Sequence, residues 1–129
     1  MPSIKGFEDL RCWKQGREIT KEIYFVTGGP EFEKDFALRG QMRRSAISIV
    51  SNIAEGFERD GNKEFMQFLS IAKGSAGELR AQLFVALDQN YLPRNDFERI
   101  RALLTENSRT ISGLISYLKQ TNLRGPKRK

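Results

Sequence analysis

The sequence contains no histidine and only one cysteine, Cys12, in 129 residues. The absence of histidine excludes catalytic triads built on histidine, histidine metal sites and the Glu-x-x-His motif of di-iron helical bundles. A single cysteine cannot form an internal disulfide, which fits a reducing compartment. Cys12 also lacks a histidine or a second cysteine that would activate its thiol, so we interpret it as a structural residue.

Motifs of membrane proteins and of phosphate-binding enzymes are missing as well. No apolar run approaches the ~18 residues of a membrane-spanning helix. The first residues have no hydrophobic signal core, so we expect a cytoplasmic protein with no membrane partner. Gly28-Gly29-Pro30 is not followed by the Gly-Lys-Ser/Thr of a phosphate-binding loop. With none of these motifs, we expect no cofactor, no metal and no enzymatic activity.

The length of the chain and its 39% hydrophobic and 29% charged residues fit one globular domain. The net charge is +6, but four of these charges lie on the last eight residues, which leaves +2 on residues 1–121. The basic residues of this end are Arg124, Lys127, Arg128 and Lys129. We therefore expect a domain over residues 1–121 and a flexible basic tail over 122–129. Such a tail attracts polyanions, although it can also serve simply as a solubilising end.

Apolar residues recur at three- and four-residue steps in four segments, and no alternating strand pattern lies between them. The predicted helices cover about residues 7–27, 36–57, 63–89 and 97–121. Gly28-Gly29-Pro30 ends the first helix, and Asp35 and Asn62 are the expected N-caps of the next two. Asn95 or Asp96 is expected to cap the fourth. Four long helices with short connectors predict an all-α, antiparallel up-down-up-down four-helix bundle.

Two glycines, Gly74 and Gly77, lie inside the third predicted helix. Each costs about 1 kcal/mol of helix stability relative to alanine. Glycine lets another backbone come close, so we expect tight contact between helices at these two positions.

Basic residues on the first predicted helix are candidates for nucleic-acid contact. Lys14, Arg17 and Lys21 share one face at i, i+3 and i+7. A solvated face is the simpler interpretation of this pattern. The candidate phosphate contacts are Arg11, Lys14, Arg17 and Lys21, together with the four basic residues of the tail. Phe7 and Trp13 fit the apolar stripe of this helix better than an exposed stacking platform, so no base preference is predicted.

A ridge of small polar residues runs beside the apolar stripe of the second predicted helix. Its members are Ser45, Ser48, Asn52, Glu55 and Arg59, and the third predicted helix repeats the pattern with Ser75, Glu78 and Gln82. Serine and asparagine are poor helix formers and unusual on a solvated face. We interpret the two ridges as facing each other or a neighbouring subunit. The expected network consists of Arg44, Ser48, Asn52, Glu55, Ser75 and Glu78.

The two glutamates of these ridges need partners. We expect Glu55 or Glu78 to pair with a nearby base, the candidates being Arg43, Arg44 and Lys73. A buried network that fixes the register of the helices is the simpler role of the ridges. A ligand-binding role is the alternative.

Several motifs then occur in order along the chain. They are Phe7-Glu8-Asp9-Leu10…Trp13, Gln41…Arg44, Ser48-Ile49…Asn52-Ile53-Ala54-Glu55-Gly56-Phe57, and Glu64-Phe65…Phe68-Leu69…Ala72…Gly74-Ser75…Glu78-Leu79. Over about residues 7–120 the chain resembles the bacterial four-helix bundle proteins encoded by intervening sequences in 23S rRNA genes. The resemblance implies an antiparallel bundle that assembles as a homopentameric ring, in a family of unknown function. A looser similarity exists to the pentameric accessory proteins of diversity-generating retroelements, which contact nucleic acid.

We therefore expect a non-enzymatic, homo-oligomeric protein that binds nucleic acid, with RNA favoured over DNA, through its basic surface and tail. The alternative is a structural or adaptor ring that recruits a protein partner and has no nucleic-acid role. The sequence discriminates only weakly between these two functions.

Overall fold

The computed structural model describes residues 4–121, which form helices and contain no strand. The elements in chain order are a short 3-10 helix η1 (Phe7–Asp9), α1 (Arg11–Val26), α2 (Pro30–Glu33), α3 (Phe36–Glu58), α4 (Asn62–Asp88) and α5 (Arg94–Thr121). The predicted all-α class is confirmed. In this described part of the chain, no helix is both long and apolar enough to cross a membrane.

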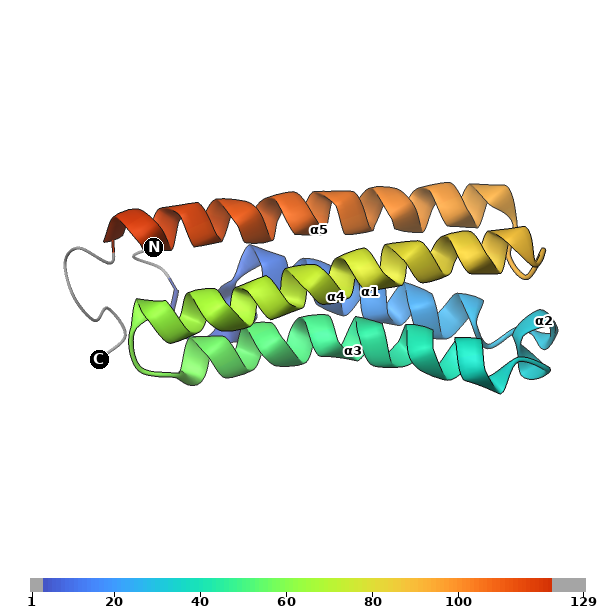
Figure 1. Ribbon diagram of the computed structural model, residues 1–129, viewed down its shortest axis with the longest axis horizontal. Coiled ribbons are helices and arrows are strands. Elements are labelled where there is room, and N and C mark those ends of the chain that lie inside the picture. The colour runs from blue at the N-terminus through green and yellow to red at the C-terminus, as the bar shows by residue number, and fades with distance from the viewer. Residues whose placement is uncertain (1–3, 122–129) are drawn as a thin grey trace.

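The four long helices, α1, α3, α4 and α5, lie side by side (Figure 1). α3, α4 and α5 form a row in this view, and α1 lies behind them. The most extensive packing joins α3 to α4, and α4 also packs against α5. α1 packs against both α3 and α5, so every long helix has two neighbours. The four-residue helix α2 lies at one end of this group and connects α1 to α3.

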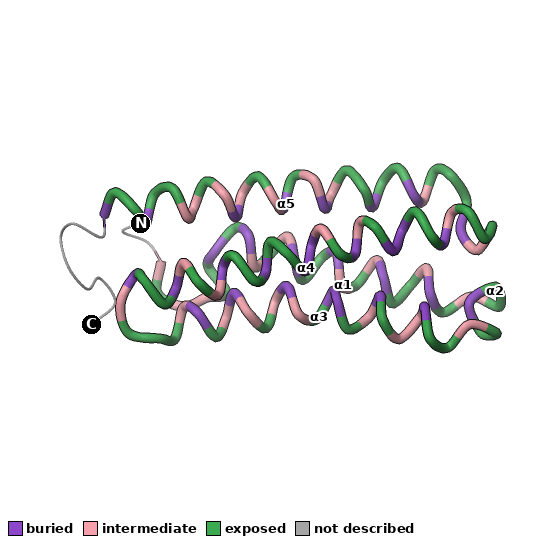
Figure 2. Tube along the Cα trace, viewed as in Figure 1, coloured by how far each residue is buried: buried purple, intermediate pink, exposed green. Residues whose placement is uncertain are grey.

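The core forms because each long helix presents one apolar stripe to the others. Buried positions follow the inner sides of the helices in Figure 2. Completely buried side chains come from every long helix and include Ile19, Met42, Leu69, Leu83 and Ile100. Burial of one such side chain contributes roughly 1.5–3 kcal/mol. The three- and four-residue spacing in the sequence therefore corresponds to a single continuous core.

The first helix differs from its prediction, because the chain is not one continuous helix from Phe7. η1 ends at Asp9, and Leu10 has an extended backbone with ψ of 132° before α1 begins at Arg11. Leu10 is 2% exposed, so the bend directs its side chain into the core. The expected connector after the first helix contains the extra helix α2, whose Phe32 is completely buried.

The helix starts are partly as predicted. Asp35 caps α3, since its Oδ1 accepts a hydrogen bond from the Leu38 amide at 3.0 Å. The prediction for the next helix is wrong, because Gly61 at φ 86° is the N-cap of α4 and Asn62 is the first helical residue. α5 begins at Arg94, directly after Pro93, so neither Asn95 nor Asp96 lies before it.

The expectation of tight contact at Gly74 and Gly77 is wrong within the chain. A Cβ at either position would meet no described atom within 4 Å outside its own helical surroundings. The close approaches are elsewhere, because a Cβ on Gly56 would lie 2.6 Å from Phe68 Cβ and one on Gly16 would lie 2.9 Å from Val50 Cγ1. Gly56 therefore allows α3 and α4 to approach near the turn between them.

We predict that Gly56→Ala destabilises the protein by about 1–3 kcal/mol, since the added methyl forces α4 away from α3. Gly113→Ala is the matched control, because a Cβ there meets nothing within 4 Å among the described residues. Helix preference alone makes the control as stable as the parent or up to about 1 kcal/mol more stable. Urea unfolding measures both variants. Equal midpoints for the Gly56 variant and the parent would contradict the close approach.

Candidate functional site

A basic groove lies between α1 and α3. It has a volume of about 720 Å³ and is lined by Trp13, Lys14, Arg17, Glu18, Thr20, Lys21 and Val50. The helical spacing of Lys14, Arg17 and Lys21 places all three cations along the same groove. None of the three forms an ion pair with another described residue. We name this surface the α1–α3 groove.

Trp13 contributes an aromatic wall to the α1–α3 groove. Its ring is half-buried and meets Phe7 edge-on, with ring centroids 5.2 Å apart. The Arg17 guanidinium carbon lies 5.7 Å from the centroid of the Trp13 ring. Trp13 packs against the core, as its place in the apolar stripe indicated, but it also lines a surface groove. The sequence pattern gives no sign of this second role, because it depends on the distance between α1 and α3.

The other basic candidates do not join this group. Arg11 lies outside the groove lining and forms a hydrogen-bonded ion pair with Glu106 of α5, with 3.4 Å between Nη2 and Oε2. The candidates Arg124, Lys127, Arg128 and Lys129 lie outside the described residues.

The small polar ridges of α3 and α4 meet at one hydrogen bond. The hydroxyl oxygens of Ser48 and Ser75 lie 2.8 Å apart. Asn52 donates from Nδ2 to the Ser48 carbonyl oxygen at 2.8 Å and to its Oγ at 3.0 Å. The three residues therefore connect α3 to α4 with small, satisfied groups, which suits two closely packed helices.

The glutamates of the ridges do not pair as predicted. Glu55 accepts a 2.8 Å hydrogen bond from Arg59, the C-cap residue directly after α3, and both side chains are exposed. Glu78 has no hydrogen bond or ion pair with any described residue, and the same is true of Arg44. Exposed pairs such as Glu55–Arg59 contribute little to stability.

A small polar cleft lies beside the Ser48–Ser75 contact. Its volume is about 200 Å³, and its lining residues are Gln41, Arg44, Ser45, Ser48, Glu78 and Gln82. Gln82 is only 8% exposed, and its Oε1 atom is buried without a hydrogen-bond partner in the described structure. A buried, unpaired amide oxygen costs roughly 1–3 kcal/mol. We name this site the polar cleft.

Two further buried amides connect helices in a way that the sequence did not predict. Asn107 of α5 donates from Nδ2 to the Cys12 carbonyl at 3.1 Å and to Gln15 Oε1 at 3.0 Å. Asn62 donates to Thr121 Oγ1 at 3.2 Å. Asn107 interrupts the apolar stripe of α5, and that interruption is the signal that could have identified it. These amides fix the register of α5 against its neighbours.

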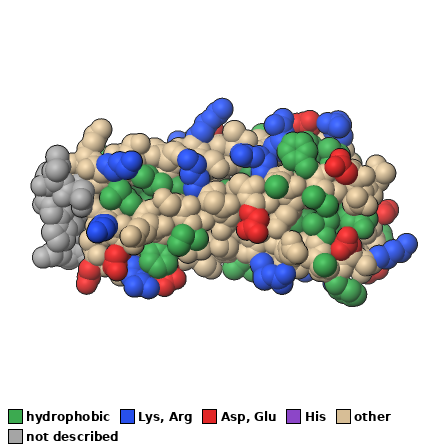
Figure 3. Space-filling model, viewed as in Figure 1, with side chains coloured by type: hydrophobic (Ala, Val, Ile, Leu, Met, Phe, Trp, Pro, Cys, Tyr) green, Lys and Arg blue, Asp and Glu red, His purple; other side chains and the backbone are tan. Residues whose placement is uncertain are grey.

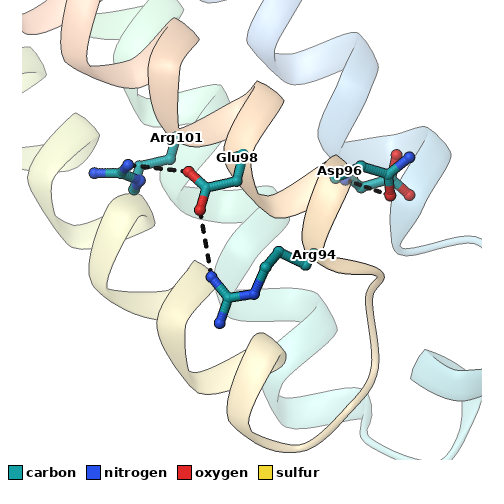
Figure 4. A network of polar contacts seen from close by, with 5 residues as sticks. Arg94, Asp96, Glu98 and Arg101 are labelled. Carbon is teal, nitrogen blue, oxygen red and sulfur yellow. Dashed lines mark hydrogen bonds and ion pairs between the residues drawn. The ribbon is translucent and has the colours of Figure 1, made fainter.

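Ion pairs neutralise the basic residues at the start of α5 (Figure 4). Glu98 binds Arg94 and Arg101, and Arg101 holds the pKa of this carboxyl below its usual range through a 3.0 Å hydrogen bond. Arg99 binds Asp96 at 2.7 Å and Glu22 of α1 at 2.8 Å. Arg109 is different, because it is exposed and has no ion pair with a described residue.

The lone thiol is shielded from solvent. Cys12 is 1% exposed, and burial raises the pKa of its thiol to about 11. Because the thiolate is the reactive form, this environment suits a packing role. Among the described residues, no three His, Cys, Asp or Glu side chains come together in a group that could hold a metal ion.

Comparison with protein families gives one clear relationship. The model of the 23S rRNA-intervening sequence protein family matches residues 8–113. The chain belongs to this family. The family resemblance read from the motifs is therefore confirmed.

A solved structure agrees with this assignment. The chain is similar to a protein of unknown function from the S23 ribosomal protein family of Bacteroides thetaiotaomicron, with a TM-score of 0.74 and 25% sequence identity. The alignment covers 81% of this chain and 97% of the other. No curated protein matches the sequence.

The buried thiol makes stability depend on pH above neutrality. The pKa of Cys12 rises from 9.0 to about 11 on folding, so the unfolded chain loses this proton first. The stabilisation is present below pH 9 and is lost as the pH rises towards 11, by up to about 2–3 kcal/mol. We predict that the stability difference between the parent and Cys12→Ala shrinks over this range. Urea unfolding at several pH values measures it, and a constant difference would contradict the prediction.

Proposed function

We propose that this protein is a non-enzymatic, homo-oligomeric helical protein that binds nucleic acid, with RNA favoured, in the α1–α3 groove. The supporting observation is the combination in one groove of Lys14, Arg17 and Lys21, none of which forms an ion pair with a described residue, with the half-buried ring of Trp13. Unpaired cations bind phosphates by releasing counterions, and an aromatic ring offers a base a surface for stacking. The family's description refers to 23S rRNA, which is consistent with an RNA partner.

The proposed protomer is an antiparallel up-down-up-down four-helix bundle. The connectors support this topology, since residues 59–61 join α3 to α4 and residues 89–93 join α4 to α5. Connectors of this length return the chain alongside the helix it has just left. The bundle then has the α1–α3 groove on one side and the α4 surface on the opposite corner.

The proposed assembly is a homopentameric ring, as the family resemblance implies. A ring repeats each groove once per copy, so weak contacts with one RNA molecule add through their effective concentration. The basic tail residues Arg124, Lys127, Arg128 and Lys129 add further positive charge to every copy.

An adaptor ring that recruits a protein partner is the second candidate function. Its supporting observation is two exposed aromatic side chains, Phe25 (78% exposed) near the end of α1 and Phe36 (72%) at the start of α3. Exposed aromatic rings are enriched at protein interfaces. Truncation of both to alanine separates the functions, because it abolishes partner capture in the adaptor and leaves RNA affinity intact in the proposed RNA-binding protein.

We predict that size-exclusion chromatography with light scattering gives a mass near five times 14.8 kDa. A structured RNA is expected to co-elute with the protein at low salt and to separate as salt increases, because phosphate contacts release counterions. A monomer would contradict the proposed ring. An oligomer that ignores RNA even at low salt would contradict nucleic-acid binding and favour the adaptor.

We predict that the triple variant Lys14→Gln, Arg17→Gln and Lys21→Gln weakens RNA binding and flattens its salt dependence. Each lost contact with a single strand lowers the slope of log K against log salt by about 0.7. Fluorescence anisotropy of a labelled RNA measures affinity, and the emission of Trp13, the only tryptophan, reports events in the groove. The parent should show a saturable change in Trp13 emission, which the variant loses.

The control removes the same charge elsewhere. Lys34, Lys63 and Lys119 are exposed and lie outside the groove lining, so changing all three to glutamine preserves the groove. The control should bind RNA several-fold more tightly than the groove variant. Equal losses in the two variants would show a diffuse charge effect and contradict the groove. Deletion of residues 123–129 measures the contribution of the tail.

A further inference from the structure

The polar cleft between α3 and α4 is chemically incomplete within one chain. Gln82 belongs to the lining of the cleft and is more than nine-tenths buried, and its Oε1 atom has no hydrogen-bond partner among the described residues. Glu78, in the same lining, has no partner among the described residues. Both groups accept hydrogen bonds, and a buried acceptor without a donor is costly. The missing group is therefore a donor, and a cationic donor fits the carboxylate best.

The size of the cleft indicates what supplies this donor. About 200 Å³ is smaller than the 300–1,000 Å³ typical of sites for small-molecule ligands. A cleft of this size accepts a single side chain. Its surroundings are suited to a helix, because Ser70, Gly74, Gly77 and Ala81 form a line of small residues along the outer side of α4. In Figure 3, backbone and uncharged polar side chains, drawn in tan, cover much of the middle of the molecule.

The same chain carries a matching donor on another face. Arg109 is exposed on α5 and forms no ion pair with any residue from 4 to 121, whereas the other arginines of that helix, Arg94, Arg99 and Arg101, are all paired. Small residues flank Arg109 along the outer side of α5 at helical spacing. These residues are Ala102, Thr105, Gly113 and Ser116. An exposed arginine among small residues is complementary to Glu78, which lies in the cleft beside the line of small residues on α4.

A second pair of charges has the same complementarity. Arg44 lines the polar cleft without a partner, and Glu106 lies one helical turn before Arg109 on α5. The present contact of Glu106 with Arg11 is exposed and 3.4 Å long, so a change of partner costs little. Each side of the contact thus offers one acid and one base.

We propose that α5 of one copy docks along α3 and α4 of the next, with Arg109 of the partner subunit inserted into the polar cleft against Glu78 and Gln82. The two faces are different surfaces of one chain, so every copy uses both at once. Such a head-to-tail contact closes into a ring when the rotation between copies permits it. The inference rests on the oligomer in the proposed function and assigns its contact surfaces.

A charge exchange tests this contact. Glu78→Arg and Arg109→Glu should each weaken assembly on the order of 10–100-fold, measured by light scattering over a dilution series. The double variant, which carries both changes in one chain, should recover assembly because the ion pair is restored in reverse. Glu33→Arg in α2 and Lys34→Glu after α2 are matched controls of the same charge change, since both residues are exposed and outside the groove and the cleft, and both variants should assemble like the parent. Assembly of either single variant at parental strength, or no recovery in the double variant, overturns the proposal.

Disulfide trapping gives an independent result in the Cys12→Ala background. A chain with both Glu78→Cys and Arg109→Cys should form a covalent ladder of several copies on oxidation, whereas either change alone should form none. Covalent dimers from Glu78→Cys alone would indicate a two-fold contact and overturn the head-to-tail arrangement. A monomeric parent overturns both this inference and the proposed oligomer. An assembled parent with unaffected single variants overturns the inference alone.

Discussion

The close packing of α3 on α4 is the constraint on which the rest of the structure depends. Gly56 brings the two helices together near their turn, because any Cβ there would meet Phe68. Further along, the Ser48–Ser75 hydrogen bond occupies the interface with two small groups. Closely packed helices leave little space between them for long side chains. Polar residues at the α3–α4 interface must therefore be short or must extend towards the solvent at its edge. Gln82 lines the polar cleft, and its buried Oε1 atom has no hydrogen-bond partner among the described residues.

The surfaces of the bundle differ in charge because the basic residues of α1 and α5 differ in how many of them form ion pairs. On α1, Lys14, Arg17 and Lys21 of the α1–α3 groove form no ion pair with any described residue. On the first turns of α5, Asp96 and Glu98 pair with the nearby arginines and cancel much of that attraction (Figure 4). The outer side of α4 carries a line of small residues, Ser70, Gly74, Gly77 and Ala81, between its exposed charged and apolar side chains. One fold thus separates a surface suited to a polyanion from a surface suited to another helix.

Sequence periodicity predicted the long helices because it reports local geometry directly. The Asp35 cap was also predictable, since capping needs only residues within one turn. The N-cap prediction for Asn62 was wrong because a contact distant in the sequence determines its role. Its amide nitrogen donates to Thr121, which is 59 residues further along the chain. Gly74 and Gly56 look equivalent in sequence, yet only the backbone placement of a neighbouring helix distinguishes them.

The candidate sites also combine features that local sequence predicts with features that depend on how the helices pack. The alignment of Lys14, Arg17 and Lys21 on one face was readable from their spacing, but the groove itself required α3 to lie beside them. The unpaired oxygen of Gln82 could not be read from any local pattern.

The buried amides of Asn62 and Asn107 differ from that of Gln82 in the polar cleft, because they fix the register of neighbouring helices. Asn62 and Asn107 each leave one oxygen unpaired, but both donate through nitrogen to a neighbouring helix, so their burial connects elements of the same chain. Gln82 makes no such contact and lines a cleft. In the proposed contact, α5 of one copy lies along α3 and α4 of the next and would supply a donor for this group, while α1 lies at the corner opposite α4. The proposed assembly and the proposed nucleic-acid binding would then use different side chains, Arg109 and the polar cleft in one case and Lys14, Arg17 and Lys21 in the other.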